Sequence, residues 1–329
     1  MALEIVKPGL QATVQDEGRV GLYAHGMPPA GALDKHAYRI GNALVGNPAG
    51  AAGIEMTYLG AEVVFSAPVV FAVTGAEMAP KLDDEEIETW RSYRAAAGQR
   101  LSFGYLTAGA RSYLAVAGGI DIAPYEGSRS TYTLVGRGGF EGRPLAAGDV
   151  LPVAGAVDGT PDRRVPEDLR PSYEGDVEAR VVTGLASYRL EPESLRALFE
   201  TSWKVTPNAN RVGYRYSGGE LRFVEREQPV GAGSDPSNVV DFGYPVGSIQ
   251  VPGGIEPICL LNDAVTAGGY ATVGTVISCD LDRIAQSQIG QATHFVEVGI
   301  DEALAARRAR RAELESIVET ISNGRRSEA

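Results

Sequence analysis

The chain of 329 residues carries a formal net charge of −12 at pH 7 and has an isoelectric point near 4.9, so charge repulsion argues against nucleic-acid or anionic-membrane partners. Its length suits one large domain or two of about 150 residues. The 2 cysteines exclude a disulfide framework and a Cys-rich zinc site. The sequence also lacks a signal-peptide pattern and an apolar run of about 18 residues, so we expect a cytoplasmic protein.

The first half of the chain is expected to consist mainly of strands, because glycines and prolines punctuate short β-rich runs. One helix is predicted over residues 34–45, where apolar residues recur at helical spacing. Asp34 is its expected N-cap, and Gly46 lies where the helix should end. The strands predicted here cover residues 62–65, 69–74, 101–103 and 112–116.

The second half is predicted to be a similar mixture, with strands around one short helix at residues 192–201. Gly, Pro and charged residues mark a linker before it, and an Ala-, Glu-, Arg- and Leu-rich tail predicts a terminal helix at 301–322. The arginine run of that tail is interpreted as a solvated face, with partner docking as the alternative. The sequence thus predicts modules at 1–153 and 175–299, a linker at 154–174 and a helical tail at 300–329.

The common catalytic motifs are absent from the sequence. There is no P-loop, no Gly-x-Ser-x-Gly elbow, no His-Glu-x-x-His segment and no Met-Lys-Met biotin-carrier segment. The 3 histidines are few for a metal site, so no metal is expected. Nothing after the glycines at 136–139 is typical of a helix, which argues against a dinucleotide-binding fingerprint.

Polar residues gather instead in glycine-rich turns. The first turn holds Gln15, Asp16 and Arg19, which could clamp a small polar substrate. The alternative is a structural turn in which Asp16 caps backbone amides and pairs with Arg19. The second turn holds Arg129 and Ser130, which suit a carboxylate or phosphate, or else a loop that satisfies its own backbone.

Two further polar turns lie in the second half. Arg211 belongs to one, which could equally be a turn with solvated arginines. Asp263, Thr266 and Tyr270 follow an apolar run and belong to a loop of a kind that often carries a site, although a plain connecting loop is the alternative. Together the four turns predict a polar pocket at loop ends without specifying the reaction.

The remaining chemically active side chains are expected to be structural. His25 and His36 could each act as acid or base, but a lone histidine is more often structural. Cys259 and Cys279 have apolar neighbours in the sequence, so we expect both to be buried and inert.

The order of these motifs resembles the biotin-dependent carboxyltransferase family, also called the allophanate hydrolase subunit 2 or Kip-antagonist family, whose members include the C-subunits of 5-oxoprolinase. The similarity runs from about residue 3 to 298. The segments that carry it lie at residues 8–21, 31–34, 42–48, 113–121, 127–131, 142–149, 210–215, 247–252 and 266–270.

The resemblance implies a mainly β fold of two cyclophilin-like β-barrel modules with a few short helices and a C-terminal helix. It also implies a companion subunit of related fold and, in the 5-oxoprolinase complex, a third subunit for ATP-dependent opening of 5-oxo-proline to glutamate. Two alternatives stay open. One is a carboxyltransferase that moves CO₂ from carboxybiotin on a separate carrier to urea or a related amide, and the other is a Kip antagonist-like regulatory binding protein.

On this interpretation Asp16 and Asp263 are the candidate catalytic residues, which orient or deprotonate the attacked amide of a small-molecule substrate. The candidate substrate-binding residues are Gln15, Arg19, Arg129, Ser130, Arg211, Thr266 and Tyr270. The sequence departs from the family pattern in the last loop, where Ala264 and Val265 replace an Arg-Gln pair, and at residues 184–186. Both changes remove polar groups and suggest altered specificity or a reduced catalytic part.

Overall fold

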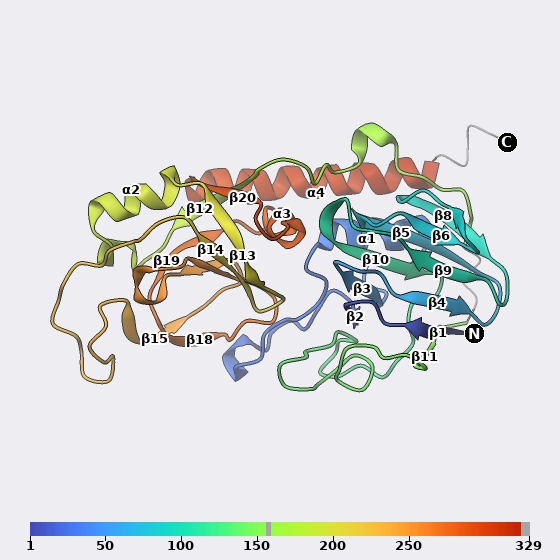
Figure 1. Cartoon of the computed structure of the whole chain (residues 1–329), viewed down its shortest axis with the longest axis horizontal. Helices are drawn as coiled ribbons and strands as arrows, with labels where there is room; N and C mark the ends of the chain where they lie inside the picture. The colour runs from blue at the N-terminus through green and yellow to red at the C-terminus, as the bar shows by residue number, and fades with distance from the viewer. Residues whose placement is uncertain (156–158, 324–329) are drawn as a thin grey trace. The chain divides into compact units, whose positions relative to one another are not determined.

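The computed structural model describes residues 1–155 and 159–323 of the chain (Figure 1). These residues form two compact units. The first unit comprises Met1–Arg19, Ala30–Glu174 and the chain from Arg311, and the second comprises Val20–Pro29 and Gly175–Arg310. No helix among the described residues is long and apolar enough to cross a membrane.

Two antiparallel sheets build the first unit. The six-stranded sheet has the order β11-β1-β4-β9-β6-β7, and the five-stranded sheet has the order β2-β3-β10-β5-β8. The strands are β1 Ala2–Lys7, β2 Gln11–Gln15, β3 Gly53–Thr57, β4 Glu62–Phe65, β5 Val69–Glu77, β6 Pro80–Leu82, β7 Glu85–Glu86, β8 Arg91–Ala95, β9 Arg100–Phe103, β10 Ala108–Val116 and β11 Val150–Pro152. Every residue of β3 and β10 is buried, as befits strands at the centre of the unit.

Helix α1, Lys35–Val45, packs against β5 and β10. Asp34 is its N-cap, because its Oδ1 accepts a hydrogen bond from the Ala37 amide at 2.9 Å. Gly46 ends the helix in the left-handed conformation with φ of 82°, which costs glycine little. Both predicted boundary signals are confirmed.

The segment expected to be a linker belongs in large part to the first unit. Residues 156–158 of it lie outside the described residues. Beyond them, Val165 is fully buried in the first core, and its amide donates to the carbonyl of Trp90 at 2.9 Å. The Arg163 carbonyl accepts a bond from the Ser92 amide at 2.8 Å, and a 3-10 helix, η2, follows at Glu167–Leu169.

The second unit is a closed seven-stranded barrel with the order β12-β19-β16-β17-β14-β13-β20. All neighbours are antiparallel except β12 and β20, which close the ring in parallel with Val177 opposite Thr293. Its strands are β12 Val177–Thr183, β13 Trp203–Ala209, β14 Gly213–Ser217, β16 Ser248–Gln250, β17 Ile258–Leu260, β19 Thr272–Val276 and β20 Ala292–Glu297. A separate two-stranded sheet pairs β15, Asn238–Gly243, with β18, Ala267–Tyr270.

Aromatic side chains fill the barrel. Trp203, Tyr214 and Tyr216 are fully buried, and Tyr216 packs edge-on against Phe295 with 5.5 Å between ring centroids. The Trp203 indole N–H donates to the Leu198 carbonyl at 2.9 Å, so the largest core side chain also satisfies its polar atom.

Short helices complete the second unit, and α4 ends the described chain. The helices are η1 Tyr23–His25, η3 Ser187–Arg189, α2 Pro192–Glu200, η4 Pro252–Gly254 and α3 Leu281–Gln286, with α4 at Ile300–Asn323. The start of α4 belongs to the second unit, where Arg310 lies 3.6 Å from Asp282. Its end belongs to the first unit, whose core includes Ile317 and Ile321. The predicted helices at 192–201 and 301–322 are therefore confirmed, and so is the mainly β fold class.

Candidate functional site

The Asp16 carboxylate is the centre of a buried polar cluster in the first unit. Its Oδ1 accepts bonds from the Gly18 amide at 2.8 Å, the Ser128 hydroxyl at 2.6 Å and the Ser130 hydroxyl at 2.5 Å. Its Oδ2 accepts from the Arg129 amide at 2.5 Å. Four donors therefore converge on one carboxylate, which ties the end of β2 to a loop more than a hundred residues away in the sequence.

A tight turn at Tyr125–Ser128 begins the loop that carries Arg129 and Ser130. The amides and carbonyls of Tyr125 and Ser128 bond each other at 2.8 and 3.1 Å, with Glu126 and Gly127 between them. Both inner residues have positive φ, 49° and 78°, as in a type I′ turn. The left-handed conformation is costly for Glu126, so the hydrogen bonds of this turn have to offset local strain.

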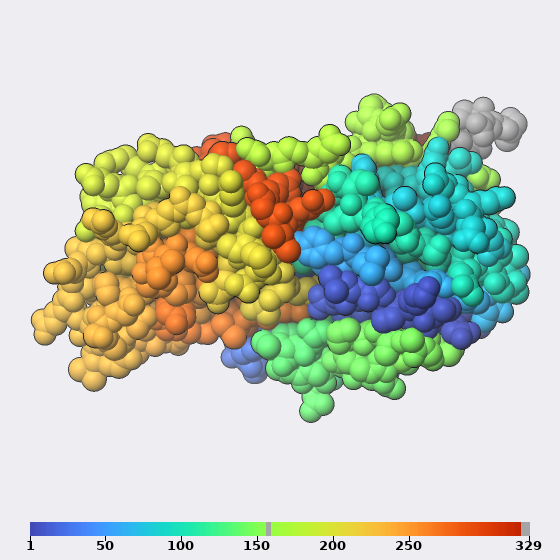
Figure 2. Space-filling model, in the orientation of Figure 1, coloured from blue at the N-terminus to red at the C-terminus, as the bar shows by residue number. Residues whose placement is uncertain are grey.

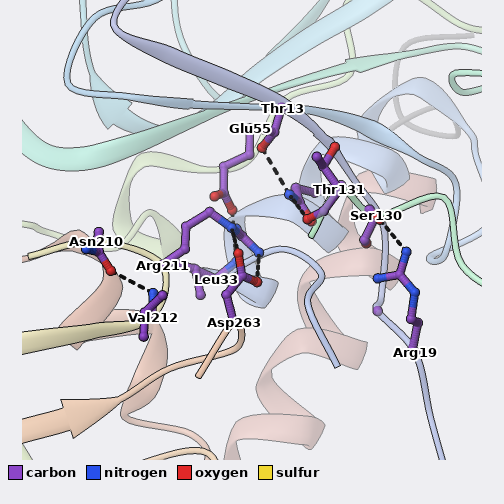
Figure 3. A network of polar contacts seen from close by, with 12 residues as sticks. Thr13, Arg19, Leu33, Glu55, Ser130, Thr131, Asn210, Arg211, Val212 and Asp263 are labelled. Atoms are coloured by element: carbon purple, nitrogen blue, oxygen red, sulfur yellow. Dashed lines mark hydrogen bonds and ion pairs between the residues drawn. The ribbon is translucent and has the colours of Figure 1, made fainter. Parts of the chain in front are cut away.

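Arg19 and Arg129 differ in how their guanidinium groups are held. Arg19 is buried, donates to the carbonyls of Ser130 at 2.5 Å and Tyr125 at 3.2 Å, and lies over the Tyr125 ring. Arg129 donates from Nε to the Ile122 carbonyl at 2.8 Å, and from Nη2 to Asp121 at 3.2 Å. The Arg129 side chain is 38% exposed, so solvent can reach its guanidinium. Figure 3 shows the other arginine, Arg19, beside Ser130.

Gln15 is fully buried beside Asp16. Its Nε2 donates to Thr13 Oγ1 at 3.0 Å and to the Thr131 carbonyl at 3.2 Å. Its Oε1 accepts no hydrogen bond from the described residues. The structure thus brings together all five residues singled out in the first half of the sequence, namely Gln15, Asp16, Arg19, Arg129 and Ser130.

The second unit holds a buried ion pair between Arg211 and Asp263. The guanidinium donates from Nε to Oδ2 and from Nη2 to Oδ1, both at 2.9 Å (Figure 3). Both side chains are at most 3% exposed. The Asp263 amide also donates to the Arg211 carbonyl at 3.1 Å, so the turn before β14 and the loop after β17 are joined twice. A fork-to-fork pair of this kind fixes orientation as well as charge.

Thr266 and Tyr270 lie further along the same loop, at β18. The Thr266 carbonyl accepts from the Tyr244 amide at 2.8 Å. The Tyr244 hydroxyl donates to the Tyr270 carbonyl at 2.9 Å and accepts from its amide at 2.7 Å, while Tyr270 itself is 42% exposed. Ala264 and Val265 stand where the family pattern has an Arg-Gln pair. Ala264 is buried and Val265 is exposed.

Sequence reasoning missed a buried network in the first unit. Glu55 Oε2 accepts from the Leu33 amide and from the Tyr113 hydroxyl, each at 2.9 Å, and Oε1 lies 3.8 Å from Arg111 Nε. The Asp34 amide in turn donates to the Tyr113 hydroxyl at 2.8 Å, and burial raises the pKa of that hydroxyl well above its usual value. The available signal was one Glu and one Arg, each the only charged residue in a strand made mostly of apolar residues.

The histidines and cysteines take varied positions. His25 is exposed and His36 is buried. Cys259 is buried as expected, and burial raises the pKa of its thiol to about 12, whereas Cys279 is only partly buried, so that expectation was wrong for it. Among the described residues no group of three His, Cys, Asp or Glu side chains could hold a metal ion.

Comparison with known proteins decides the family. A family model described as carboxyltransferase domain, subdomain A and B, matches residues 25–297. The chain belongs to this family. It is 37% identical to the C-subunit of the 5-oxoprolinase of Escherichia coli, over 98% of this chain and 99% of that protein. The resemblance inferred from the sequence motifs is thereby confirmed.

Two larger relatives contain a region that is similar to most of this chain. The urea amidolyase of Saccharomyces cerevisiae is 34% identical over 91% of this chain, which corresponds to 17% of that protein. The crystal structure of the Kluyveromyces lactis urea carboxylase matches 96% of this chain with a TM-score of 0.90 and 31% identity, and the match covers 29% of that chain. The chain therefore spans less than a third of these two relatives.

Proposed function

We propose that this chain is a subunit of a heteromeric, ATP-dependent 5-oxoprolinase-type amidohydrolase, which opens the cyclic amide of 5-oxo-proline to give glutamate. The observation that carries the proposal is the end-to-end match with a 5-oxoprolinase C-subunit, over 98% of this chain and 99% of that one. In the yeast urea amidolyase the matching region is only 17% of the protein. The likeness to the 5-oxoprolinase C-subunit covers 99% of that relative, which supports the first arrangement.

The proposed partners follow from that role. They are a companion subunit of related cyclophilin-like fold and a third, catalytic subunit. The proposal assigns ATP to the complex, because this sequence has no P-loop. A cytoplasmic location is part of the same proposal.

The two clusters supply the proposed substrate contacts. In the first unit, Arg129 binds the substrate carboxylate, because its guanidinium is partly exposed and the Asp16 carboxylate holds its backbone amide at 2.5 Å. Asp16 orients this arrangement, with Gln15, Arg19 and Ser130 around it.

In the second unit, Asp263 orients the attacked amide. Its own position is fixed by the two bonds from Arg211 at 2.9 Å. Thr266 and the half-exposed Tyr270 complete this proposed group.

The decisive experiment measures glutamate formed from 5-oxo-proline and ATP by this chain with its co-purified partners, with each component omitted in turn. Glutamate formation that requires this chain supports the proposal. Arg129→Ala should raise KM for 5-oxo-proline by about tenfold or more, because a charge-assisted contact is lost. Arg196→Ala, which removes an exposed arginine of α2 outside both clusters, is the matched control and should change nothing. An intact complex that forms no glutamate would refute the proposal.

A second candidate is biotin-dependent carboxyl transfer to urea or a related amide, favoured by the TM-score of 0.90 with urea carboxylase. It needs carboxybiotin on a separate carrier, because this sequence lacks a Met-Lys-Met segment. Carboxylation of urea by carboxybiotin in the absence of glutamate formation would favour it.

A third candidate, a Kip antagonist-like regulatory protein, is favoured by the loss of polar groups at Ala264 and Val265, and a kinase inhibitor among the co-purified proteins would support it.

A further inference from the structure

Arg189 is a buried cation of the second unit that has no carboxylate partner among the described residues. It ends the short helix η3 and is 3% exposed. Its Nη1 donates to the Asn238 carbonyl at 2.7 Å and its Nη2 to the amide oxygen of Gln228 at 3.3 Å. Its Nε, also buried, donates to no acceptor in the described part of the chain. Both hydrogen-bond acceptors of the Arg189 guanidinium, the Asn238 carbonyl and the Gln228 amide oxygen, are therefore neutral.

A buried guanidinium in this state is costly. Removal from water penalises the charged form unless an anion compensates it. Arg211, at the same 3% exposure, shows the usual solution, since Asp263 binds it with two bonds of 2.9 Å. Burial, and after it the positive charge of Arg226, lower the pKa of the Arg189 guanidinium, while Tyr188 acts in the opposite direction. An anion bound beside Arg189 would offset both the burial of its charge and the repulsion from Arg226.

The segment that covers Arg189 is suited to a bound ligand. Residues 224–237 contain no helix or strand, and most of them are exposed. Figures 1 and 2 show this part of the second unit, coloured gold, at the surface. Gly231 and Gly233 have φ of 95° and 70°, a conformation that lets backbone amides turn toward an anion. Long loops without regular structure are frequently functional.

Gln228 links the loop of residues 224–237 to the buried Arg189 through a hydrogen bond. Its Oε1 accepts the long 3.3 Å bond from Arg189, while its Nε2 donates to the Asp235 carbonyl at 2.6 Å. An ionised oxygen is a much stronger acceptor than an amide oxygen, so an anion that reached Arg189 would compete well for Nη2 and would also give Nε an acceptor. The Asn238 carbonyl would stay bonded, since it uses the other nitrogen.

We propose that Arg189 and Arg226 form a binding site for a small oxyanion, a carboxylate, hydrogencarbonate or phosphate group, which replaces the amide oxygen of Gln228. Asn238 lies opposite Tyr270 in the β15–β18 sheet, so the site adjoins the strand that carries Tyr270. This site is separate from the Arg129 and Asp263 groups and does not depend on the 5-oxoprolinase reaction.

The test is calorimetric titration of the full chain with sodium acetate, hydrogencarbonate and phosphate, each at constant ionic strength with chloride as reference. We expect saturable binding of at least one anion, and the one that binds tightest identifies the ligand class. Arg226→Ala should weaken that binding by about tenfold, which is the scale of a charge-assisted contact. Gln228→Ala should strengthen it, because the competing acceptor is gone.

Arg222→Ala is the matched control, since Arg222 is an exposed arginine two residues before this loop and is not among the charges that act on Arg189. It should leave the affinity within about twofold of the parent. Arg189→Gln should abolish binding in protein whose circular dichroism is unchanged. Binding no better than chloride, or equal losses in Arg226→Ala and Arg222→Ala, would overturn the proposal.

Discussion

Gly138 lies where any side chain would collide with the Asp16 cluster. A Cβ built on it would overlap Arg19 Nη2 and the Ser130 carbonyl oxygen, the two atoms joined by the 2.5 Å bond. Gly136, in the same loop, has nearly the same φ, 64° against 66°, but a Cβ there would meet only the Gly142 carbonyl oxygen, at 4.0 Å. An alanine at either position has the same backbone strain, but only an alanine at Gly138 would also collide with the cluster. Comparing the two variants therefore separates the two effects.

The expected costs follow from these contacts. Gly136→Ala should destabilise the first unit by about 1–2 kcal/mol, the cost of a left-handed alanine. Gly138→Ala carries that cost and, in addition, about 1–3 kcal/mol for overpacking against atoms that cannot move without losing the Arg19–Ser130 bond. We therefore expect Gly138→Ala to be the more destabilising by about 1–3 kcal/mol.

Urea unfolding followed by tryptophan fluorescence measures the difference. The chain has 2 tryptophans, and Trp90 lies in the first unit and Trp203 in the second, so a Trp203→Phe background reports on the first unit alone. Equal free energies of unfolding for the two alanine variants would refute the close packing of this loop against Arg19.

Asp263→Asn should destabilise the second unit by about 3–5 kcal/mol in thermal or urea unfolding, because it removes a carboxylate bonded twice to a buried Arg211. Replacing both partners, as Asp263→Leu with Arg211→Met, should cost less than Asp263→Asn alone, and a larger loss would contradict this account. Burial raises the pKa of Cys259 from 9.0 to about 12, so the stability due to its neutral thiol is complete below about pH 9 and is lost as the pH rises toward 12. At about pH 8 a thiol reagent should therefore modify Cys279 in the native protein and Cys259 only after unfolding, and Cys279→Ala should abolish the native reaction.

Elements set by local sequence were predictable. Helix α1 has its cap at Asp34, its stop at Gly46 and a helical apolar spacing between them, all within a dozen residues. The α4 helix was predictable from helix-forming residues alone. The residues at 159–174 look like a linker by composition, but the sequence contains no sign that Val165 inserts into the first core.

Many residues of the two polar clusters could be picked out from the sequence, but the bonds that join them could not be predicted. Asp16 and Ser130 were each noticed as polar residues of glycine-rich turns, yet the bond between them joins positions 114 apart in the sequence. The Arg211–Asp263 pair spans 52 positions in the same way. Glu55 was missed because no strand was predicted over residues 53–57, whereas in the structure this segment is β3 and is buried throughout.

The barrel's closure has a consequence for synthesis of the chain. Strand β20 lies between β12 and β13, so a nascent chain that ends before Ala292 leaves both of those strands with an unpaired edge. Folding of the first unit is delayed in the same way, because its hydrophobic core includes Ile317 and Ile321 of α4. The barrel cannot close before β20 is made, and the first unit cannot complete its core before α4 is made. Open strand edges invite pairing with other chains during that interval.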